Sequence, residues 1–230
     1  MSDSELIEKA LDQTPTCTLN DRRRQQILLT NLQTWAKLAE EHHLQYWLSA
    51  GSLVGYVQRG GLLPHDADTD ITMMSDDVPR LIDIAQSNFS SNYEIKVHPQ
   101  WNIVGYHNRS YHNDQGIPFV APNARFIHRQ SAKHVDIFPA YYFNPDSFAK
   151  TTEKQLSRNI TEYNVSYGWL SYPREWTYPL QTCYFSGIKV LCPAQPKKLV
   201  EAMYGVEALT RSDTKCINGK WVHFRQKKNT

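Results

Sequence analysis

Both the expected fold and the expected site follow from the sequence Asp66-Ala67-Asp68-Thr69-Asp70-Ile71. Thirteen residues separate it from Gly51-Ser52. Successive side chains of a β-strand point to opposite faces, so three aspartates at a spacing of two are expected on one strand face, about 6.6 Å apart. Carboxylates this close repel one another unless a cation lies between them. Mg²⁺ takes carboxylate oxygens and completes its shell with water and substrate phosphates. A Gly-Ser turn with a short helix would offer backbone N–H groups to those phosphates, so the pattern predicts a metal-assisted phosphate site.

The same alternation can also belong to an antiparallel strand with one solvated face, on which Ala67, Thr69 and Ile71 point inward. The segments on either side, Leu62-Leu63-Pro64-His65 and Ile71-Thr72-Met73-Met74, are largely apolar. A strand with such neighbours is expected at the centre of a sheet, where a charge without a partner is costly. We therefore favour the metal site over the solvated strand.

The composition is that of a globular chain, and residues 1–230 are expected to form a single domain. The formal net charge of +2 does not indicate a general nucleic-acid binder, and the basic clusters at 22–24 and 225–228 are interpreted as solvated faces. No apolar run approaches the ~20 residues of a membrane span, so no transmembrane segment is expected. The first five residues lack the basic start and apolar core of a signal peptide.

The cysteines and the glycosylation motifs leave the compartment open. Four cysteines without a C-x-x-C pair do not favour a zinc site. If Gly187-Ile188 is the turn of a hairpin, Cys183 and Cys192 lie directly opposite each other, as a disulfide or as two buried thiols. Four N-x-S/T motifs occur, at Asn88, Asn108, Asn159 and Asn164. The chain is expected in the cytoplasm if it is complete, or in the Golgi or secretory lumen if an N-terminal anchor was removed.

Apolar periodicity and turn residues divide the chain into N-terminal helices (1–44), a catalytic core (45–140), and an insertion followed by a C-terminal hairpin and helix (141–230). Helices are expected at 21–43 with Asn20 as N-cap, 53–58 before Gly60-Gly61, 75–87 with Ser75 or Asp76 as cap, 145–159, and 196–204 before Gly205. Strands are expected at 45–50, 67–74, 93–98, 101–107, 124–128 and 134–138, with a hairpin over 183–192. The fold class that follows is α/β (α+β).

One further carboxylate, Asp136, lies inside the apolar strand Val135-Asp136-Ile137-Phe138-Pro139. A lone strand aspartate commonly faces solvent or caps a neighbouring element. An aspartate bracketed by Val, Ile and Phe has an equal claim to a functional pocket, because a carboxylate is almost never buried there without a partner. Both interpretations stay open on these residues alone.

Together these residues resemble the nucleotidyltransferase fold, which combines a Gly-Ser turn, a spacer, a D-x-D strand and a third aspartate on a neighbouring strand. Within that fold, Ala-Gly-Ser-Leu-Val-Gly-Tyr-Val-Gln-Arg at 50–59, followed by Leu63-Pro64-His65-Asp66, is similar to the first motif of the LicD/fukutin family. Residues 135–139 match the second motif of that family, and 187–193 with Tyr204-Gly205 match the third. The resemblance covers about residues 30–206 and implies a nucleotidyltransferase-like mixed β-sheet flanked by helices.

The resemblance also implies an activity. Members of the family transfer a phosphorylated group, such as phosphocholine, ribitol phosphate or mannosyl phosphate, from a nucleotide-activated donor to a glycan hydroxyl. The partners it implies are therefore a CDP- or GDP-linked donor and a glycan acceptor. By the same match, Asp68, Asp70 and Asp136 would hold Mg²⁺ or Mn²⁺, and Asp66 would be an auxiliary carboxylate.

The remaining roles come from the same match. The residues that would contact donor phosphates are Gly51, Ser52 and Arg59. Arg59 offers a planar fork for phosphate oxygens, although it could also be a surface arginine after a short helix. Either Asp136 or Asp66 would accept the proton of the incoming hydroxyl. His65 belongs to the donor side and is expected to orient the aspartate strand, because hard Mg²⁺ favours oxygen ligands.

Two other functions remain open. A nucleotidyltransferase that adds a nucleoside monophosphate to a small-molecule hydroxyl could use the same Gly-Ser turn and aspartate strand. The Leu-Pro-His-Asp segment and the Asp-Ile-Phe-Pro strand favour the phosphotransferase instead. A catalytically silent glycan-binding or accessory protein could also share the fold, and the presence of all three key aspartates argues against it.

Overall fold

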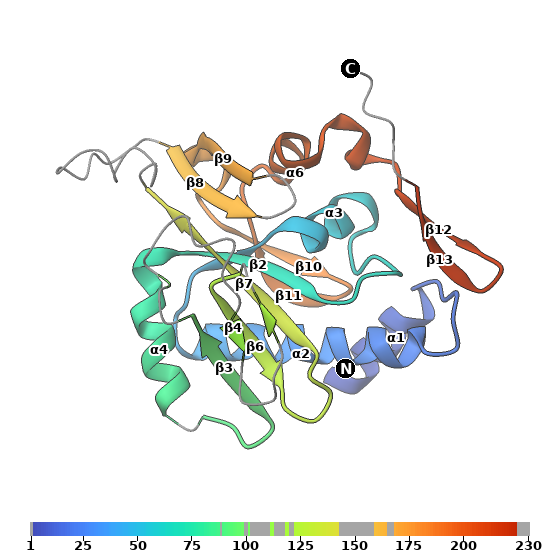
Figure 1. Cartoon of the computed structure of the whole chain (residues 1–230), viewed down its shortest axis with the longest axis horizontal. Helices are drawn as coiled ribbons and strands as arrows, with labels where there is room; N and C mark the ends of the chain where they lie inside the picture. The colour runs from blue at the N-terminus through green and yellow to red at the C-terminus, as the bar shows by residue number, and fades with distance from the viewer. Residues whose placement is uncertain are drawn as a thin grey trace.

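A mixed β-sheet forms the centre of the molecule in a computed structural model of the chain (Figure 1). The structure describes residues 2–87, 89–98, 101, 111–112, 118–119, 122–142, 159–164 and 168–224. The strand order is β1 (Tyr46–Leu48), β2 (Thr69–Met74), β7 (His134–Tyr141), β6 (Ala124–His128) and β3 (Tyr93–Val97), and β8 (Asn159–Asn164) pairs with β7 and with β9 (Gly168–Pro173). Strands β2 and β7 are parallel, and the other pairs are antiparallel. The expected mixed sheet is confirmed.

Helices pack against both faces of this sheet. The long helix α2 (Asp21–Glu41) crosses one face with α1 (Asp3–Asp12) beside it, and α3 (Ala50–Arg59) and α6 (Pro196–Tyr204) lie on the other face (Figure 1). Helix α4 (Val78–Gln86) follows a 3₁₀ turn at Ser75–Asp77 and packs against β3. Further 3₁₀ turns occur at Arg174–Trp176 and Val206–Leu209.

Short hairpins lie outside the main sheet. They are β4 (Tyr111–His112) with β5 (Pro118–Phe119), β10 (Gln181–Phe185) with β11 (Ile188–Cys192), and β12 (Thr214–Ile217) with β13 (Lys220–His223). The β10–β11 hairpin packs against β1 and α2. The β12–β13 hairpin projects at one side of the molecule, beyond the end of α3 (Figure 1).

The apolar core lies between α2 and the sheet. Leu28, Leu32 and Trp35 recur at helical spacing along one side of α2, and all three are fully buried. The Trp35 ring meets the Phe126 ring of β6 edge-on, with 5.8 Å between the centroids. Loss of such a buried ring costs about 3–5 kcal/mol, so this contact is a principal anchor of α2 on the sheet.

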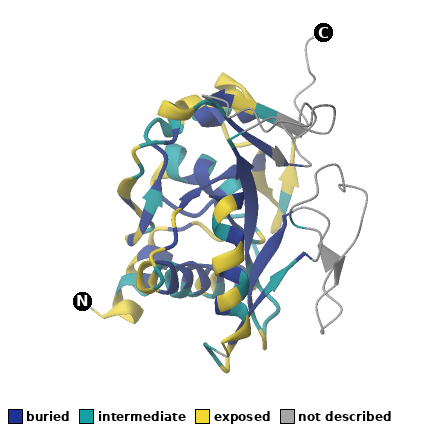
Figure 2. Cartoon of the chain, turned by 90° about the vertical axis from the view of Figure 1, so that its left-hand side faces the viewer, coloured by how far each residue is buried: buried dark blue, intermediate teal, exposed yellow. Residues whose placement is uncertain are grey.

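Strand alternation directs the carboxylates away from α2. Phe126 lies opposite Val135 in the register of β6 and β7, and both belong to the face that α2 covers. Arg125 and Asp136, one residue along each strand, therefore point to the opposite face, where α3 lies. Figure 2 shows the central strands as a dark-blue buried layer, with exposed positions on the outer side of α4. The charged residues of the sheet are thus set inside a largely buried framework.

The helix expected at 21–43 is confirmed as α2, with Asn20 at its N-cap position as predicted. Asn20 occupies the N-cap position, yet its side chain makes no capping hydrogen bond to a described residue. The Asp21 carboxylate instead accepts from the backbone N–H groups of Cys17 at 2.6 Å and Thr18 at 2.8 Å. Both donors precede the helix, so the Asp21 carboxylate holds the preceding segment against the start of α2 and does not cap the first N–H groups of the helix.

The boundary between the strand expected at 45–50 and the helix expected at 53–58 differs from the prediction. Strand β1 ends at Leu48, and α3 begins at Ala50, so Gly51 and Ser52 lie in the first turn of α3 rather than in a turn before it. Ala50 has a φ of +42°, in the left-handed region that non-glycine residues rarely adopt. Gly60, with a φ of +72°, ends the helix as predicted.

The prediction that three aspartates share one face of a strand over 67–74 is wrong. Strand β2 begins at Thr69, and only Asp70 of the three lies within it. The N–H of Asp66 donates to the carbonyl of Leu63 at 3.1 Å, which closes a turn with Pro64 at its second position. Proline favours that position because its ring fixes φ near −65°, so the turn keeps Asp66 and the following bend out of the strand.

The helix expected at 75–87 is divided into the 3₁₀ turn and α4, and its predicted cap is wrong. Neither Ser75 nor Asp76 is the N-cap of α4; that position is held by Asp77, whose side chain makes no capping bond to a described residue. Pro79 lies in the first turn, as predicted. Since proline has no N–H, this turn has one donor fewer for a cap to bind.

Three of the expected strands, 93–98, 124–128 and 134–138, correspond to β3, β6 and β7. The strand expected at 101–107 and the helix expected at 145–159 lie outside the described residues, apart from Trp101 in a turn and Asn159 at the start of β8. The β8–β9 pair was not predicted. The helix expected at 196–204 is confirmed as α6, which Gly205 ends with a φ of +86°.

The hairpin over 183–192 is present, but its turn is one residue earlier than predicted. The turn residues are Ser186 and Gly187, with φ of +50° and +81°, rather than Gly187 and Ile188. A two-residue turn of this kind needs positive φ at both positions, which a β-branched isoleucine disfavours. Consequently Cys183 lies opposite Val190 rather than Cys192.

All four cysteines form disulfides. Cys183 and Cys192 are bonded as diagonal neighbours of the β10–β11 hairpin, with 5.9 Å between their Cα atoms. Cys17 and Cys216, which are 199 residues apart in the sequence, form the second bond, a pairing that was not predicted. The disulfide alternative for Cys183 and Cys192 is the one that the structure contains. Among the described residues, no helix is both long and apolar enough to cross a membrane.

Candidate functional site

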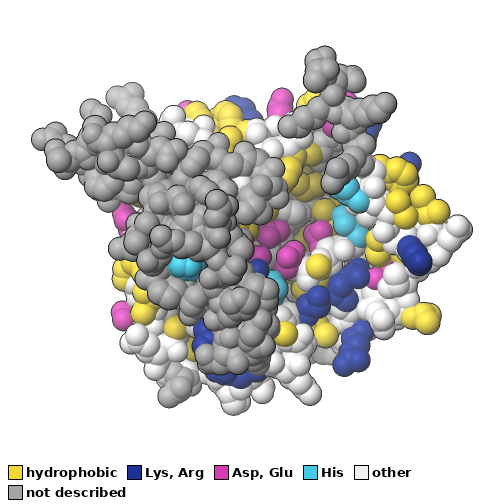
Figure 3. Space-filling view, viewed as in Figure 1, with side chains coloured by type: hydrophobic (Ala, Val, Ile, Leu, Met, Phe, Trp, Pro, Cys, Tyr) yellow, Lys and Arg dark blue, Asp and Glu magenta, His cyan; other side chains and the backbone are white. Residues whose placement is uncertain are grey.

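The carboxylates of the site come from two parallel strands and the loop before one of them. Asp70 of β2 and Asp136 of β7 are direct register partners. Asp68 precedes β2, and ligand atoms of Asp68, His134 and Asp136 lie within 4.8 Å of one another. The register thus places Asp70, rather than Asp68, opposite Asp136 on the neighbouring strand. Figure 3 shows acidic side chains gathered at the centre of this face, with histidines beside them.

The first turn of α3 lies directly against these carboxylates. The backbone N–H of Asp70 donates to Ser52 Oγ at 2.8 Å, and the N–H of Ser52 reaches Asp70 Oδ2 at 3.4 Å. A Cβ atom at Gly51 would be 3.2 Å from Asp70 Oδ2 and 3.5 Å from an oxygen of Asp66. Glycine therefore lets the helix start approach both carboxylates, and the two predicted residues of the Gly-Ser pair lie at the acidic cluster.

Burial and mutual repulsion make the charged form of these carboxylates costly. Burial raises the pKa of Asp70 well above its usual value, and the charges of Asp68, Asp136 and Asp66 raise it further. Burial and the charge of Asp68 raise the pKa of Asp66 to about 8, against an opposing effect of Arg24. Such shifts, caused by burial and by several like charges together, are typical of functional sites.

Asp136 is the best-compensated carboxylate of the cluster. Its Oδ1 atom lies 2.7 Å from Nε of Arg125 and 3.2 Å from Nε2 of His134. Burial raises the pKa of Asp136, while His134 and Arg125 oppose that rise. Arg125 and Asp136 are opposite each other in the β6–β7 register, so the sheet itself fixes this ion pair.

Two residues near the cluster were not foreseen from the sequence. His134 shares a strand face with Asp136, and the His-x-Asp spacing at 134–136 was the signal that could have identified it. Glu162 of β8 is fully buried, and its carboxylate accepts from Thr72 Oγ1 at 3.2 Å, two residues along β2 from Asp70. No local signal marked Glu162, because it lies in a segment that was interpreted as an insertion.

Arg59 and His65 are positioned by other contacts. The guanidinium of Arg59 donates to the carbonyls of Leu62 at 3.0 Å and Gln13 at 2.9 Å. Arg59 is eight residues beyond Gly51 in α3, about 12 Å along the helix axis, so its role at donor phosphates stays a prediction. His65 Nε2 is 4.0 Å from Asp66 Oδ1, and burial lowers the pKa of His65.

The side chains at this site fit a divalent cation. Carboxylate oxygens are the ligands that Mg²⁺ and Mn²⁺ take, and an imidazole such as that of His134 widens the range to other transition metals. Asp66 Oδ2 is buried and has no hydrogen-bond partner among the described residues. A buried carboxylate oxygen without a donor, beside three further aspartates, is in an environment that a cation would stabilise.

A comparison with protein families matches most of the chain. A family model described as "LicD/FKTN/FKRP, nucleotidyltransferase domain" matches residues 43–195, which include every predicted site residue. The chain belongs to the LicD family. The predicted resemblance is thereby confirmed, and α6 and the β12–β13 hairpin lie beyond the region that the LicD model matches.

Individual relatives are distant. The lipopolysaccharide cholinephosphotransferase LicD of Haemophilus influenzae is 28% identical over 75 residues, which are 33% of this chain and 28% of that relative. An uncharacterised protein of Rickettsia prowazekii is 30% identical over 67 residues, 29% of this chain and 25% of that protein. These matches span about a quarter of each relative. Membership of the LicD family with a cholinephosphotransferase as a distant homologue supports phospho-group transfer in general terms.

Proposed function

We propose that this protein is a metal-dependent phosphotransferase that moves a phospho-alcohol, phospho-alditol or phospho-sugar from a nucleotide-diphosphate-activated donor to a glycan hydroxyl. The nucleoside monophosphate would be the leaving group. The observation that supports the proposal is the pairing of Asp70 with Asp136 in register, with the start of α3 against Asp70 and with ligand atoms of Asp68, His134 and Asp136 within 4.8 Å of one another. Phosphoryl transfer needs positioning and charge neutralisation more than covalent chemistry, and this arrangement supplies both.

The metal ligands in this proposal are Asp68, Asp70 and Asp136, with His134 as the additional donor. A bound Mg²⁺ or Mn²⁺ would supply charge neutralisation at the donor diphosphate. Gly51 and Ser52 would present the N–H groups of the α3 start to phosphate oxygens, in the direction that the helix dipole favours. Their short side chains leave room for that approach.

Asp66 is the better of the two proposed bases for the incoming hydroxyl. Oδ1 of Asp136 is already held by Arg125 and His134, whereas Oδ2 of Asp66 has no partner among the described residues. An acceptor hydroxyl that donates to the Asp66 carboxylate would transfer its proton there as the new P–O bond forms. Arg125, by holding Asp136, would keep one metal ligand in a fixed orientation.

Calorimetric titration of the purified protein with Mn²⁺ tests the metal assignment. We expect one site whose affinity falls at least tenfold in Asp68→Asn and stays unchanged in Asp83→Asn, an exposed aspartate of α4. Donor type can be screened by thermal unfolding with CDP-, GDP- and UDP-linked compounds, because a ligand of the folded state raises its stability. Equal Mn²⁺ affinity in the wild type and Asp68→Asn would contradict the proposal.

The disulfides favour an oxidising compartment over the cytoplasm as the place where this protein acts. Disulfides that use every cysteine of a chain are typical of secreted and lumenal proteins. Asn164, one of the four glycosylation motifs, is buried in β8 with 4% of its surface exposed, so a glycan could not be carried there in the folded protein. Mass spectrometry of the protein under non-reducing conditions tests both points.

A further inference from the structure

A cavity of about 310 Å³ adjoins the carboxylate site. Its lining includes Gly51, His65 and Asp66, three residues of the proposed site. The rest of its wall comes mainly from residues 204–224, at the end of α6 and the base of the β12–β13 hairpin. This C-terminal wall lies beyond the region that the LicD family model matches, so the family likeness does not account for it.

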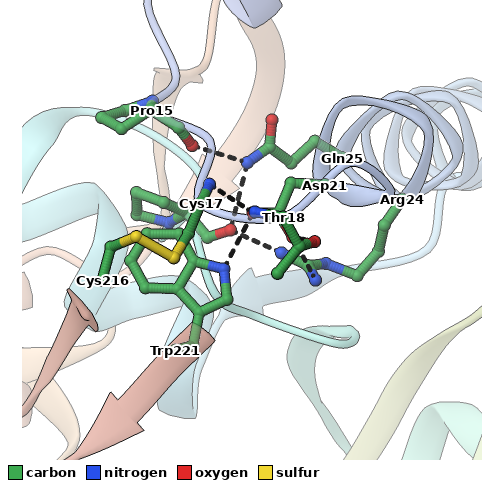
Figure 4. The surroundings of a disulfide bond; sticks show 9 residues. Pro15, Cys17, Thr18, Asp21, Arg24, Gln25, Cys216 and Trp221 are labelled. Atoms are coloured by element: carbon green, nitrogen blue, oxygen red, sulfur yellow. Dashed lines mark hydrogen bonds and ion pairs between the residues drawn. A yellow bond between two sulfur atoms is a disulfide. The ribbon is translucent and has the colours of Figure 1, made fainter. Parts of the chain in front are cut away.

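The C-terminal wall is fastened to the body of the protein at the hairpin. The disulfide between Cys17 and Cys216 ties β12 to the segment before α2 (Figure 4). On the neighbouring strand, Trp221 Nε1 donates to the Asp21 carboxylate at 2.9 Å, and the indole ring lies 5.8 Å from the His65 ring. The same hairpin therefore contacts both α2 and the loop that carries Asp66.

A chain of polar contacts continues from this anchor to the Pro64 loop. Asp21 pairs with Arg24 at 2.8 Å, and Arg24 donates to the carbonyl of Pro64 at 2.6 Å. Gln25 donates to the carbonyls of Pro15 at 2.9 Å and Pro64 at 3.1 Å (Figure 4). Asp21, which binds Trp221 of the hairpin, is thus linked through Arg24 to the loop that carries His65 and Asp66.

The charges around the cavity disfavour a phosphate ligand. Three carboxylates line it, those of Asp66, Glu207 and Asp213. Arg211, a cation of the lining, is already paired with Glu207 at 2.6 Å, and His223 lies 3.4 Å from Asp213. An anionic diphosphate brought here would meet an excess of negative charge, whereas hydroxyl groups could donate to these carboxylates.

The aromatic and steric features of the cavity suit a sugar ring. Tyr204 and Phe224 both belong to the lining, and their rings offer apolar surface to the C–H face of a sugar. Tyr204 also has a phenol hydroxyl, which can donate a hydrogen bond to a sugar oxygen. A volume of about 310 Å³ lies at the lower end of the ~300–1,000 Å³ range of small-molecule sites, enough for one ring rather than a whole nucleotide-sugar.

We propose that this cavity binds the acceptor as a neutral sugar ring, and that the C-terminal hairpin, held by the Cys17–Cys216 disulfide, forms its outer wall. The inference rests on the proposed function, because it assigns the acceptor side of the same transfer site. Asp66 then connects the two halves, since it lines the cavity and belongs to the carboxylate cluster. A sugar bound in the cavity would therefore lie beside the residue that is proposed to accept the proton of its hydroxyl.

Saturation-transfer NMR with a panel of methyl glycosides tests the site without knowledge of the natural acceptor. We expect at least one neutral glycoside to bind the wild-type protein. Ala208→Trp, which fills the cavity, should weaken that binding at least tenfold, and Ala202→Trp should not, because Ala202 is an exposed residue of α6 outside the cavity. Absence of binding to the wild type, or equal binding to both variants, overturns the proposal.

Paired cysteine substitutions test the wall. The double variant Cys17→Ser/Cys216→Ser should lose glycoside affinity, whereas Cys183→Ser/Cys192→Ser removes the other disulfide and should retain it. Unchanged glycoside affinity in Cys17→Ser/Cys216→Ser overturns the assignment of the wall. The comparison of Ala208→Trp with Ala202→Trp tests the cavity independently, even where the double cysteine variant does not fold.

Mn²⁺ titration of the same variants separates this inference from the proposed function. Mn²⁺ binding without glycoside binding overturns the cavity assignment alone, and glycoside binding without Mn²⁺ binding overturns the proposed function alone. Cytidine monophosphate serves as the anionic probe in the absence of metal. If it competes with the glycoside for the cavity of the wild-type protein, the charge argument is wrong and the acceptor assignment falls.

Discussion

Replacement of Asp21 by asparagine should reduce stability in a way that depends on pH. Asp21 is fully buried and accepts from the backbone N–H groups of Cys17 and Thr18, from Thr18 Oγ1 and from Trp221 Nε1. Burial alone would raise the pKa of Asp21, but the hydrogen bonds from Thr18 and Cys17 lead the effects that lower it, from 3.8 to about 2. The charged carboxylate therefore stabilises the folded state.

The size of the effect follows from that shift. At about 1.4 kcal/mol per pKa unit, a fall from 3.8 to about 2 is worth about 2 kcal/mol of unfolding free energy. Because the folded-state pKa is the lower one, this contribution is fully present above about pH 4 and is lost as the pH falls through about 2. An asparagine at position 21 has no charge to lose, so the variant lacks the contribution at every pH.

Urea unfolding followed by tryptophan fluorescence measures this difference, with both disulfides kept oxidised. The wild type should exceed Asp21→Asn by about 2 kcal/mol more at neutral pH than at about pH 2. Asp83→Asn, an exposed substitution in α4, should stay within about 0.5 kcal/mol of the wild type across the range. A wild-type advantage that is constant between neutral pH and about pH 2 would refute the stabilisation of the folded state by the Asp21 charge.

Four further substitutions test the site and its framework. Asp70→Asn should abolish transfer yet stabilise the metal-free protein, because it removes one of several repelling buried charges. A transfer assay checks the loss of activity, and unfolding in EDTA checks the gain in stability. Gly55→Ala should destabilise the protein by about 1–3 kcal/mol, since its Cβ would lie 2.5 Å from a main-chain oxygen. The Cβ of Gly60→Ala would meet no atom within 4 Å, so this substitution should destabilise the protein by only about 1 kcal/mol, from the positive φ alone. Arg125→Gln should destabilise the metal-free protein by about 3 kcal/mol, because Asp136 loses a buried partner. Urea unfolding should show that Mn²⁺ recovers part of that loss. An equal loss with and without Mn²⁺ would contradict the assignment of Asp136 as a metal ligand.

The parts of the fold that the sequence predicted are those with strong local patterns. The apolar residues around Asp70 and around Asp136 mark two buried strands, and the structure pairs these strands in parallel with the aspartates in register. The spacing of Leu28, Leu32 and Trp35 identifies α2, and Gly205 marks the end of α6. In each case the side-chain period agrees with the tertiary contacts, so local and global preferences coincide.

The features that the sequence did not predict correctly depend on local turns or on contacts between distant segments. Pro64 closes a turn that excludes Asp66 and Asp68 from β2, although their spacing alone fits a strand face. Glu162 approaches the site only because β8 pairs with the end of β7. The Cys17–Cys216 disulfide joins residues 199 positions apart, and no pattern near either cysteine encodes the other. His134 could be predicted from its spacing to Asp136, because residues two apart lie on the same strand face and an imidazole can also bind a metal ion.

The central claim is that the phospho-group moves and the nucleotide leaves, and a doubly labelled donor tests it most directly. A CDP- or GDP-linked donor would carry one label in the base and another in the transferred group, and would be incubated with Mn²⁺, the protein and a mixture of neutral oligosaccharides. We expect the base label in free nucleoside monophosphate and the group label on the oligosaccharide, with both products absent for Asp70→Asn. Base label bound covalently to the oligosaccharide would contradict the account and establish nucleotidyl transfer instead.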